Sequence, residues 1–270
     1  MHNTSPALIR SILYGSALML AACSGGGGSG GTDTGSTTPG TGTSAGGQTG
    51  TVTYTPYACD AARYEQAKRL RIYQVMVEAF VDADSSANAG SAYGPSHHKG
   101  DIAGIMASLD YIKGLGMNAI WLTPIFESVP ESGQDEWADR LDGTGYFASN
   151  YFAVDPKFGT LEQLRTLVET AHAKGLYVFF DGVFGHFKHN AHNYPSPEGR
   201  RLSTSGPAQG ATGREAVYPD DLDFFKEVAT YWIRELKIDG WRLDQAYQVP
   251  VGAWGRSAGR WKRLRMRSPM

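Results

Sequence analysis

The chain contains four short runs that are almost continuously apolar, at residues 71–80, 119–126, 176–184 and 240–244. A strand with one wet face would alternate apolar and polar residues, whereas these runs do not. Near-continuous apolar strands are typical of a parallel sheet that is buried on both faces. The pattern therefore predicts four parallel strands.

Between these runs, apolar residues recur at helical spacing and predict three helices. The first begins at the N-cap Asp101 and ends near Gly114 and Gly116. The second begins at Thr160, where Gln163 completes a capping box, and the third begins at Asp221. The positions expected to face inward are Ile102, Ile105, Met106, Leu109 and Ile112, then Leu161, Leu164, Leu167, Val168 and Ala171, then Phe224, Phe225, Val228, Trp232 and Leu236.

Alternating strands and helices make either a doubly wound sheet or a (β/α)8 barrel. Both folds place their chemistry at the carboxyl ends of the strands. No glycine-rich dinucleotide motif, phosphate loop, paired CxxC or serine elbow occurs in the chain, so those enzyme classes lack their usual signal. The polar residues at the predicted strand ends are Glu78, Thr123, Asp181, His186, Arg242 and Asp244.

Arg242 and Asp244 are two residues apart on the last predicted strand, so their side chains share one face. A guanidinium beside a carboxylate keeps the carboxylate ionised, which suits a nucleophile or an electrostatic stabiliser. A purely structural ion pair is the alternative for this spacing alone.

The N-terminus predicts an exported protein. Residues 1–23 have the layout of a secretory signal, and the residues before Cys23 resemble the lipobox of a bacterial lipoprotein. Residues 24–50 are rich in Gly, Ser and Thr and are expected to form a flexible tether. We therefore expect a lipid anchor at Cys23 and a location in the bacterial cell envelope, at the outer membrane or cell surface. A plain signal peptide is the alternative.

The formal charge of −2 combines two opposed regions. Residues 255–270 contain six basic residues and no acidic one, and this basic composition sets in after Trp254. The remainder is acidic, which argues against a nucleic-acid partner. We expect the atypical basic tail to be a spurious, frameshifted end.

Four segments in order resemble the α-amylase family of glycoside hydrolases, over about residues 70–253. They are GDIAGIMASLDYIKGLGMNAIWLTPIFES, GTGYFASNYFAVDPKFGTLEQL, DGVFGH and GWRLDQA. The resemblance implies an incomplete (β/α)8 barrel, with about the first four strands and three helices. It implies a barrel part at 60–187, a small extra domain inserted at 188–219, and a continuation of the barrel at 220–254.

The resemblance also implies roles for five residues in a retaining reaction on an α-glucan or maltooligosaccharide. Asp244 would be the nucleophile and Arg242 would keep it anionic. Tyr146 would stack against the sugar, His186 would donate a hydrogen bond to a sugar hydroxyl, and Asp181 would orient Arg242 or the sugar. A retaining enzyme needs a second carboxyl group as proton donor.

The chain departs from the family pattern at three points. The family's proton donor, a Glu, follows a fifth strand, so we expect a truncated chain with weak or no activity. Gly185 stands where the family has an Asn that helps to hold calcium; Asp82 and Asp84 are weak substitutes, so no cofactor is assigned. Tyr247 and Gln248 replace a Lys-His pair that contacts sugar. Loop histidines are expected to be solvated rather than metal-bound; they are His97, His98, His189 and His192.

Two other functions remain open from the sequence. One is a lipoprotein that binds starch or maltooligosaccharides without cleaving them, with Tyr146, Trp121 and Trp137 as stacking residues. The other is a non-functional gene product, which the composition of the tail favours.

Overall fold

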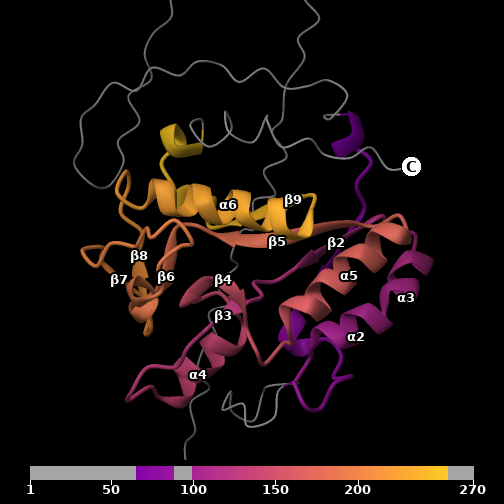
Figure 1. Ribbon diagram of the computed structural model, residues 1–270, viewed down its shortest axis with the longest axis horizontal. Helices are drawn as coiled ribbons and strands as arrows, with labels where there is room; N and C mark the ends of the chain where they lie inside the picture. The colour runs from indigo at the N-terminus through magenta and orange to yellow at the C-terminus, as the bar shows by residue number, and fades with distance from the viewer. Residues whose placement is uncertain (1–64, 88–98, 255–270) are drawn as a thin grey trace, which may run out of the picture.

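The computed structural model describes residues 65–87 and 99–254. Its centre is a sheet of four parallel strands, which confirms the predicted parallel arrangement. The strand order follows the chain without reversal, as in a barrel, whereas a doubly wound sheet reverses its order at a switch point. The strands are β1 (Ile72–Val75), β2 (Ala119–Leu122), β5 (Tyr177–Val183) and β9 (Gly240–Asp244) (Figure 1).

The first two predicted strands are shorter than expected. β1 ends at Val75 and a 3-10 turn, η1 (Val77–Ala79), follows it. β2 ends at Leu122, before Pro124, which has no N–H to donate to a neighbouring strand. Phe126 instead begins a separate strand, β3 (Phe126–Glu127), that pairs antiparallel with β4 (Asn150–Val154).

The first predicted helix is divided into α2 (Ile102–Ala107) and α3 (Leu109–Gly114). The break lies at Ser108, whose hydroxyl donates to the carbonyl of Gly104. A serine hydroxyl that bonds to the preceding turn competes with the helical hydrogen bonds and bends the helix. The prediction of one continuous helix over this segment was therefore wrong.

The other two helices begin where the sequence predicts. α5 (Leu161–Ala173) has the Thr160–Gln163 capping box in full, although Leu161 is exposed rather than buried. α6 (Leu222–Leu236) begins after Asp221, and its predicted inward positions are buried. Figure 1 shows α2, α3 and α5 grouped together, with α6 apart from them along β5 and β9.

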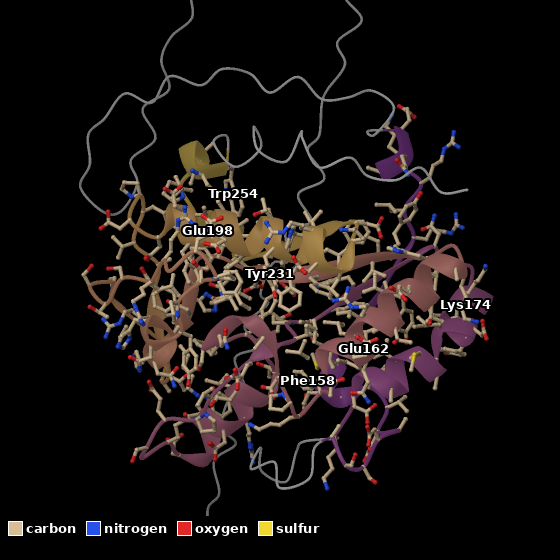
Figure 2. The ribbon with its side chains drawn as sticks, in the orientation of Figure 1. Phe158, Glu162, Lys174, Glu198, Tyr231 and Trp254 are labelled. Carbon is tan, nitrogen blue, oxygen red and sulfur yellow. The ribbon has the colours of Figure 1, made fainter. Side chains whose placement is uncertain are left out.

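Aromatic side chains fill the space between α6 and the strands. The indole of Trp232 donates to the carbonyl of Tyr151 at 2.9 Å, and its ring packs against Phe126 and Phe180. Tyr231 lies toward β4 with its ring 5.2 Å from that of Phe152 (Figure 2). Burying rings of this size supplies a large share of the hydrophobic stabilisation of the fold.

Residues 186–215 form a second, three-stranded sheet with the order β6-β8-β7. A 3-10 turn, η2 (His189–Asn193), follows β6. Earlier in the chain, the helix α4 (Glu136–Gly143) lies between β3 and β4. Most residues of the three-stranded sheet lie in the segment predicted as an insertion at 188–219, and the predicted domain boundaries themselves stay a prediction. The strands are β6 (His186–Lys188), β7 (Ala208–Gln209) and β8 (Gly213–Glu215).

The chain between β6 and α6 is tied to α6 by two buried carboxylates. Asp221 accepts from the backbone N–H groups of Ser203 and Val217, rather than capping its own helix. Glu227 accepts from the N–H of Glu198 at 2.9 Å and from the guanidinium of Arg200 at 2.8 Å. These bonds fix the inserted segment against the helix that precedes β9.

The predicted signal segment, Cys23, the tether at 24–50, His97, His98 and the basic tail at 255–270 lie outside the described residues. Within the described part of the chain, no helix is long and apolar enough to cross a bilayer.

The cap at Asp101 provides a test of this packing. Its buried carboxylate accepts from the N–H of Gly104 and from those of Ala83 and Asp84, so Asp101→Ala leaves three donors without a partner. We expect a loss of about 3 kcal/mol in the free energy of unfolding, measured by urea denaturation. Asp135→Ala, which removes an exposed cap with one bond to Ala138, should cost about 1 kcal/mol. Equal losses in the two variants would contradict the role given to Asp101.

Candidate active site

The charged centre of the structure is Arg242, whose guanidinium lies between two carboxylates at the carboxyl end of the sheet. Its Nη1 is 2.9 Å and 3.0 Å from the two oxygens of Asp181 and 2.7 Å from Oδ1 of Asp244. Asp181 and Arg242 are direct partners in the register of β5 and β9, so their side chains leave the sheet on the same face. The sequence places Arg242 and Asp244 together, and the sheet register adds Asp181.

Two aromatic residues complete the surroundings of Asp181. The indole of Trp121 donates to Oδ2 of Asp181 at 3.1 Å, and the phenol of Tyr146 donates to the same oxygen at 3.1 Å. The guanidinium carbon of Arg242 lies 4.5 Å from the centre of the Trp121 ring, within the range of a cation–π interaction. Both oxygens of Asp181 therefore accept from protein donors, and its predicted role in orienting Arg242 stays a prediction.

The two carboxylates differ in their access to solvent. The side chain of Asp181 is 0% exposed and that of Asp244 is 13% exposed. Of these two carboxylates, Asp244 is therefore the one that a molecule bound at the surface can reach.

Burial also sets the protonation of the site. Burial raises the pKa of Asp181 to about 7, against the opposing effect of the Arg242 guanidinium. Burial, with a smaller effect of the Asp181 charge, raises the pKa of Tyr146 well above its usual value. Tyr146 is thus a hydrogen-bond donor at neutral pH.

His186 lies beside this centre rather than in contact with the charged residues. Its side chain is buried, its Nδ1 is 3.0 Å from Oε1 of Gln248, and its ring centre is 5.1 Å from that of Phe147. Phe147 follows Tyr146 in the chain, so one dipeptide contacts both Asp181 and His186. The predicted hydrogen bond from His186 to a sugar stays a prediction.

Gly185 and Gln248 are two of the departures from the family pattern, and the structure places them in contact. A Cβ atom at residue 185 would lie 2.3 Å from Oε1 and 2.5 Å from Cβ of Gln248. Only a glycine leaves room for the Gln248 side chain to reach His186. The sequence shows each departure separately, but their contact links positions 63 residues apart and was missed.

This contact bears on the calcium that the family resemblance implies. Gly185 offers no side-chain oxygen, and Gln248 fills the adjacent space. Asp84 accepts from Ser86 and from Gln163 at 3.1 Å, hydrogen bonds that lower the pKa of Asp84. No group of three or more His, Cys, Asp or Glu residues that could hold a metal occurs in the described ranges. The residues present do not fit the calcium site of the family pattern.

The loop histidines of the described part have protein partners. Nδ1 of His192 is 2.9 Å from the carbonyl of His189, and Nδ1 of His189 is 3.6 Å from a carboxylate oxygen of Glu131. These contacts involve one acidic residue and give no set of metal ligands.

The structure also contains a buried ion pair that sequence analysis missed. Lys188 is 0% exposed and pairs with Asp142 at the end of α4, which also accepts from Gln134 at 2.7 Å. Burial raises the pKa of Asp142, while Lys188 and Gln134 oppose the shift. The pair joins β6 to the segment that leads into Tyr146. A lysine next to a loop carries no sequence signal for burial, so only the tertiary structure reveals it.

The comparisons with known proteins point to one family. The family model for the alpha amylase catalytic domain matches residues 74–200. A cyclomaltodextrinase from Geobacillus thermopakistaniensis is 32% identical over 213 residues, which are 67% of this chain and 34% of the relative. An intracellular maltogenic amylase from Bacillus subtilis is 33% identical over 57% of this chain and 28% of the relative.

Solved structures give the same result. The crystal structure of AmyP in complex with maltose is 62% identical, with a TM-score of 0.69, over 77% of this chain and 40% of that one. The acarbose complex of an alpha-amylase from Geobacillus thermoleovorans is 31% identical with a TM-score of 0.55, over 72% and 44% of the two chains.

The fold is an incomplete (β/α)8 barrel, and its charged centre lies at the carboxyl end of the parallel sheet. The chain belongs to the α-amylase family, and it spans about a third of the length of the curated relatives that it matches.

The contact between residues 185 and 248 can be tested by a substitution cycle. Gly185→Ala should reduce the free energy of unfolding by about 1–3 kcal/mol, because the new Cβ overlaps the Gln248 side chain. Gln248→Gly in the same chain should restore part of that loss. Gly114→Ala, where nothing lies within 4 Å, is the matched control and should be neutral or stabilising. If Gly185→Ala behaved like the control, the assigned contact would be wrong.

The raised pKa of Asp181 predicts a pH dependence of stability. The ordinary pKa is 3.8 and the folded value is about 7, so the folded state binds the proton more tightly than the unfolded chain. The contribution of Asp181 is therefore fully present below pH 3.8 and is lost as the pH rises through 7. The difference in unfolding free energy, wild type minus Asp181→Asn, should fall by a few kcal/mol between about pH 4 and 7 and then level off. A difference that grows over this range would show that Arg242 dominates over burial.

Proposed function

We propose that this chain carries the nucleophile of a retaining glycoside hydrolase that acts on α-glucans or maltooligosaccharides. The observation that carries the proposal is the placement of the partly exposed Asp244, whose Oδ1 is 2.7 Å from Nη1 of Arg242, the nitrogen that also donates to Asp181. The complex of the 62% identical AmyP with maltose supports a maltooligosaccharide as the ligand.

In the proposed reaction, the Asp244 carboxylate attacks the anomeric carbon of a bound glucosyl unit. A carbon–oxygen bond to Asp244 forms as the bond to the leaving oxygen breaks, and the leaving oxygen takes a proton. Water then attacks the same carbon and gives up a proton to solvent, the carbon–oxygen bond to Asp244 breaks, and the sugar leaves with the carboxylate restored. Arg242 stabilises the carboxylate before attack and after release, and Asp181 holds Arg242 in place.

The proton donor of this reaction is not assigned to a described residue. Asp181 is the other carboxyl group in contact with Arg242, but it is buried and bonded to Arg242, Trp121 and Tyr146. Without acid catalysis a glycosidase loses about 10²–10⁴-fold in rate on a poor leaving group. A substrate with a good leaving group therefore tests the nucleophile separately from the acid.

We also propose, from the sequence alone, that the protein is exported and held at the bacterial cell envelope by a lipid on Cys23. Incorporation of labelled palmitate that is lost in Cys23→Ser would test this anchor. The location does not affect the chemistry of the site.

A non-catalytic starch-binding protein remains the second candidate, and Trp137 favours it because its ring is exposed on α4. The other two stacking residues expected for a starch-binding protein are Trp121 and Tyr146, and both donate hydrogen bonds to Asp181. Binding of maltoheptaose without turnover of any substrate would favour this candidate over the hydrolase.

The hydrolase is tested by release of 4-nitrophenolate from 4-nitrophenyl α-maltoside. The wild-type chain should release it above the rate of the uncatalysed reaction, since this leaving group needs little protonation. Asp244→Asn should lower the rate by about 10³-fold or more, because the attacking group is gone. Asp223→Asn, on the exposed face of α6, is the control and should leave the rate unchanged. Equal rates in wild type and Asp244→Asn would rule out Asp244 as the nucleophile.

A further inference from the structure

The ion pair of Lys188 and Asp142 takes no part in the proposed reaction, yet both of its side chains are buried, with Lys188 0% and Asp142 1% exposed. Taking two charges out of water is costly, and their attraction repays that cost only when the geometry is favourable. A buried ion pair is therefore weak evidence for stability on its own. What the pair does follows from the two segments that it joins.

The first segment leads from Asp142 to Tyr146. Asp142 is the next-to-last residue of α4, and its carbonyl accepts from the N–H of Gly145 at 3.0 Å. Gly145 has φ +78°, and a Cβ atom there would lie 2.2 Å from the carbonyl oxygen of Pro124. Only a glycine fits this turn. The turn is short and closely packed, so the position of Asp142 sets the position of the Tyr146 backbone.

The second segment leads from Asp181 on β5 to Lys188 on β6. β5 ends at Val183 and β6 begins at His186. The phenol of the buried Tyr151 contacts the carbonyl oxygens of both residues at 2.9 Å. One side chain thus fixes both ends of the connection between the two strands.

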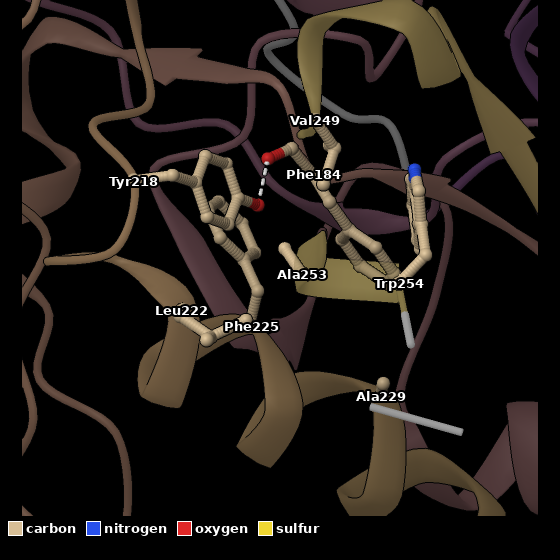
Figure 3. Close-up of a pocket in the computed structure, with 8 residues that line it drawn as sticks. All are labelled: Phe184, Tyr218, Leu222, Phe225, Ala229, Val249, Ala253 and Trp254. Atoms are coloured by element: carbon tan, nitrogen blue, oxygen red, sulfur yellow. Dashed lines mark hydrogen bonds between the residues drawn. The ribbon is translucent and has the colours of Figure 1, made fainter. Parts of the chain in front are cut away.

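The middle of this connection is fixed from the side of α6. The carbonyl of Phe184 accepts from the phenol of Tyr218 at 2.7 Å (Figure 3). The ring of Phe184 lines an apolar pocket together with Val249 and Trp254. The backbone between Asp181 and Lys188 is therefore held on both sides.

The residues from Tyr146 to Ala148 also lie against β6. The N–H of Lys188 donates to the carbonyl of Ala148 at 3.0 Å. A Cβ atom at Gly213, the register partner of Lys188, would lie 2.4 Å from a ring carbon of Phe147. Lys188 therefore meets this segment through its backbone and meets α4 through its ammonium group.

These contacts form a closed ring. From Asp181 the chain leads to Lys188, which pairs with Asp142. From Asp142 the turn leads to Tyr146, whose phenol donates back to Asp181 at 3.1 Å. We propose that Lys188 and Asp142 are a positioning pair that holds the phenol of Tyr146 on Asp181. The inference rests on the proposed function for its effect on the reaction, whereas the contact can be measured without turnover.

The test removes both charges together, because removing one would leave the other buried and unpaired. In the variant Lys188→Met/Asp142→Asn, the phenol of Tyr146 should be held less well on the Asp181 carboxylate. That hydrogen bond favours the anion, so its weakening should raise the pKa of Asp181 above the wild-type value of about 7. Carbon-13 NMR of labelled aspartate carboxyl groups across the pH range measures this pKa, and Asp181→Asn identifies the signal.

Two further variants separate positioning from a general loosening of the fold. Tyr146→Phe removes the phenol and should raise the pKa of Asp181 at least as much. In the Tyr146→Phe background, Lys188→Met/Asp142→Asn should add no further shift, because both changes act through one hydrogen bond. The matched control is Arg200→Met/Glu227→Gln, which removes an ion pair between the inserted segment and α6 and should leave the pKa of Asp181 unchanged.

An Asp181 pKa that stays at the wild-type value in Lys188→Met/Asp142→Asn, or that shifts as much without the Tyr146 phenol, would overturn the positioning role. If that variant does not fold, Lys188→Met alone gives the same measurement, because burial raises the pKa of Asp142 and lets its carboxyl take up a proton. A wild-type chain that releases no 4-nitrophenolate would contradict the proposed function and not the positioning pair.

Discussion

The site depends on the shared hydrogen bonding of Arg242 between Asp181 and Asp244. A guanidinium paired with one carboxylate is common. Here the guanidinium of Arg242 pairs with two carboxylates, the buried Asp181 and the partly exposed Asp244. Trp121 and Tyr146 hold Asp181 in turn, so the orientation of Arg242 is fixed before any ligand binds. Preorganisation of this kind lets the outer carboxylate act without a rearrangement of its surroundings.

The parallel sheet makes this arrangement possible because it brings distant segments to one edge. Asp181 and Arg242 are 61 residues apart, yet they face each other in the register of β5 and β9. The strands follow one another around the sheet in chain order, so each new strand adds its C-terminal residues to the same edge. Tyr146, which follows α4 in the chain, bonds to Asp181 at that edge, and Lys188 of β6 pairs with Asp142 of α4.

The elements that follow a local rule were predictable from the sequence. The Thr160–Gln163 capping box and the shared face of Arg242 and Asp244 each depend on residues close together in the chain. The division of the first helix at Ser108 depends on one hydroxyl, which donates to the Gly104 carbonyl in the preceding turn. The spacing of apolar residues does not show this hydrogen bond. The Gln248–Gly185 contact and the burial of Lys188 depend on tertiary structure. Each joins segments that are distant in the chain, and no local sequence pattern indicates that they meet.

The central claim is that Asp244 is the attacking group. A fluorinated α-glucosyl fluoride, which forms a slowly hydrolysed glycosyl ester, tests it most directly when the labelled protein is digested and mapped by mass spectrometry. We predict one added glucosyl group per chain, on the peptide that contains Asp244. A label on Asp181 or on another carboxylate, with Asp244 unmodified, would contradict the account.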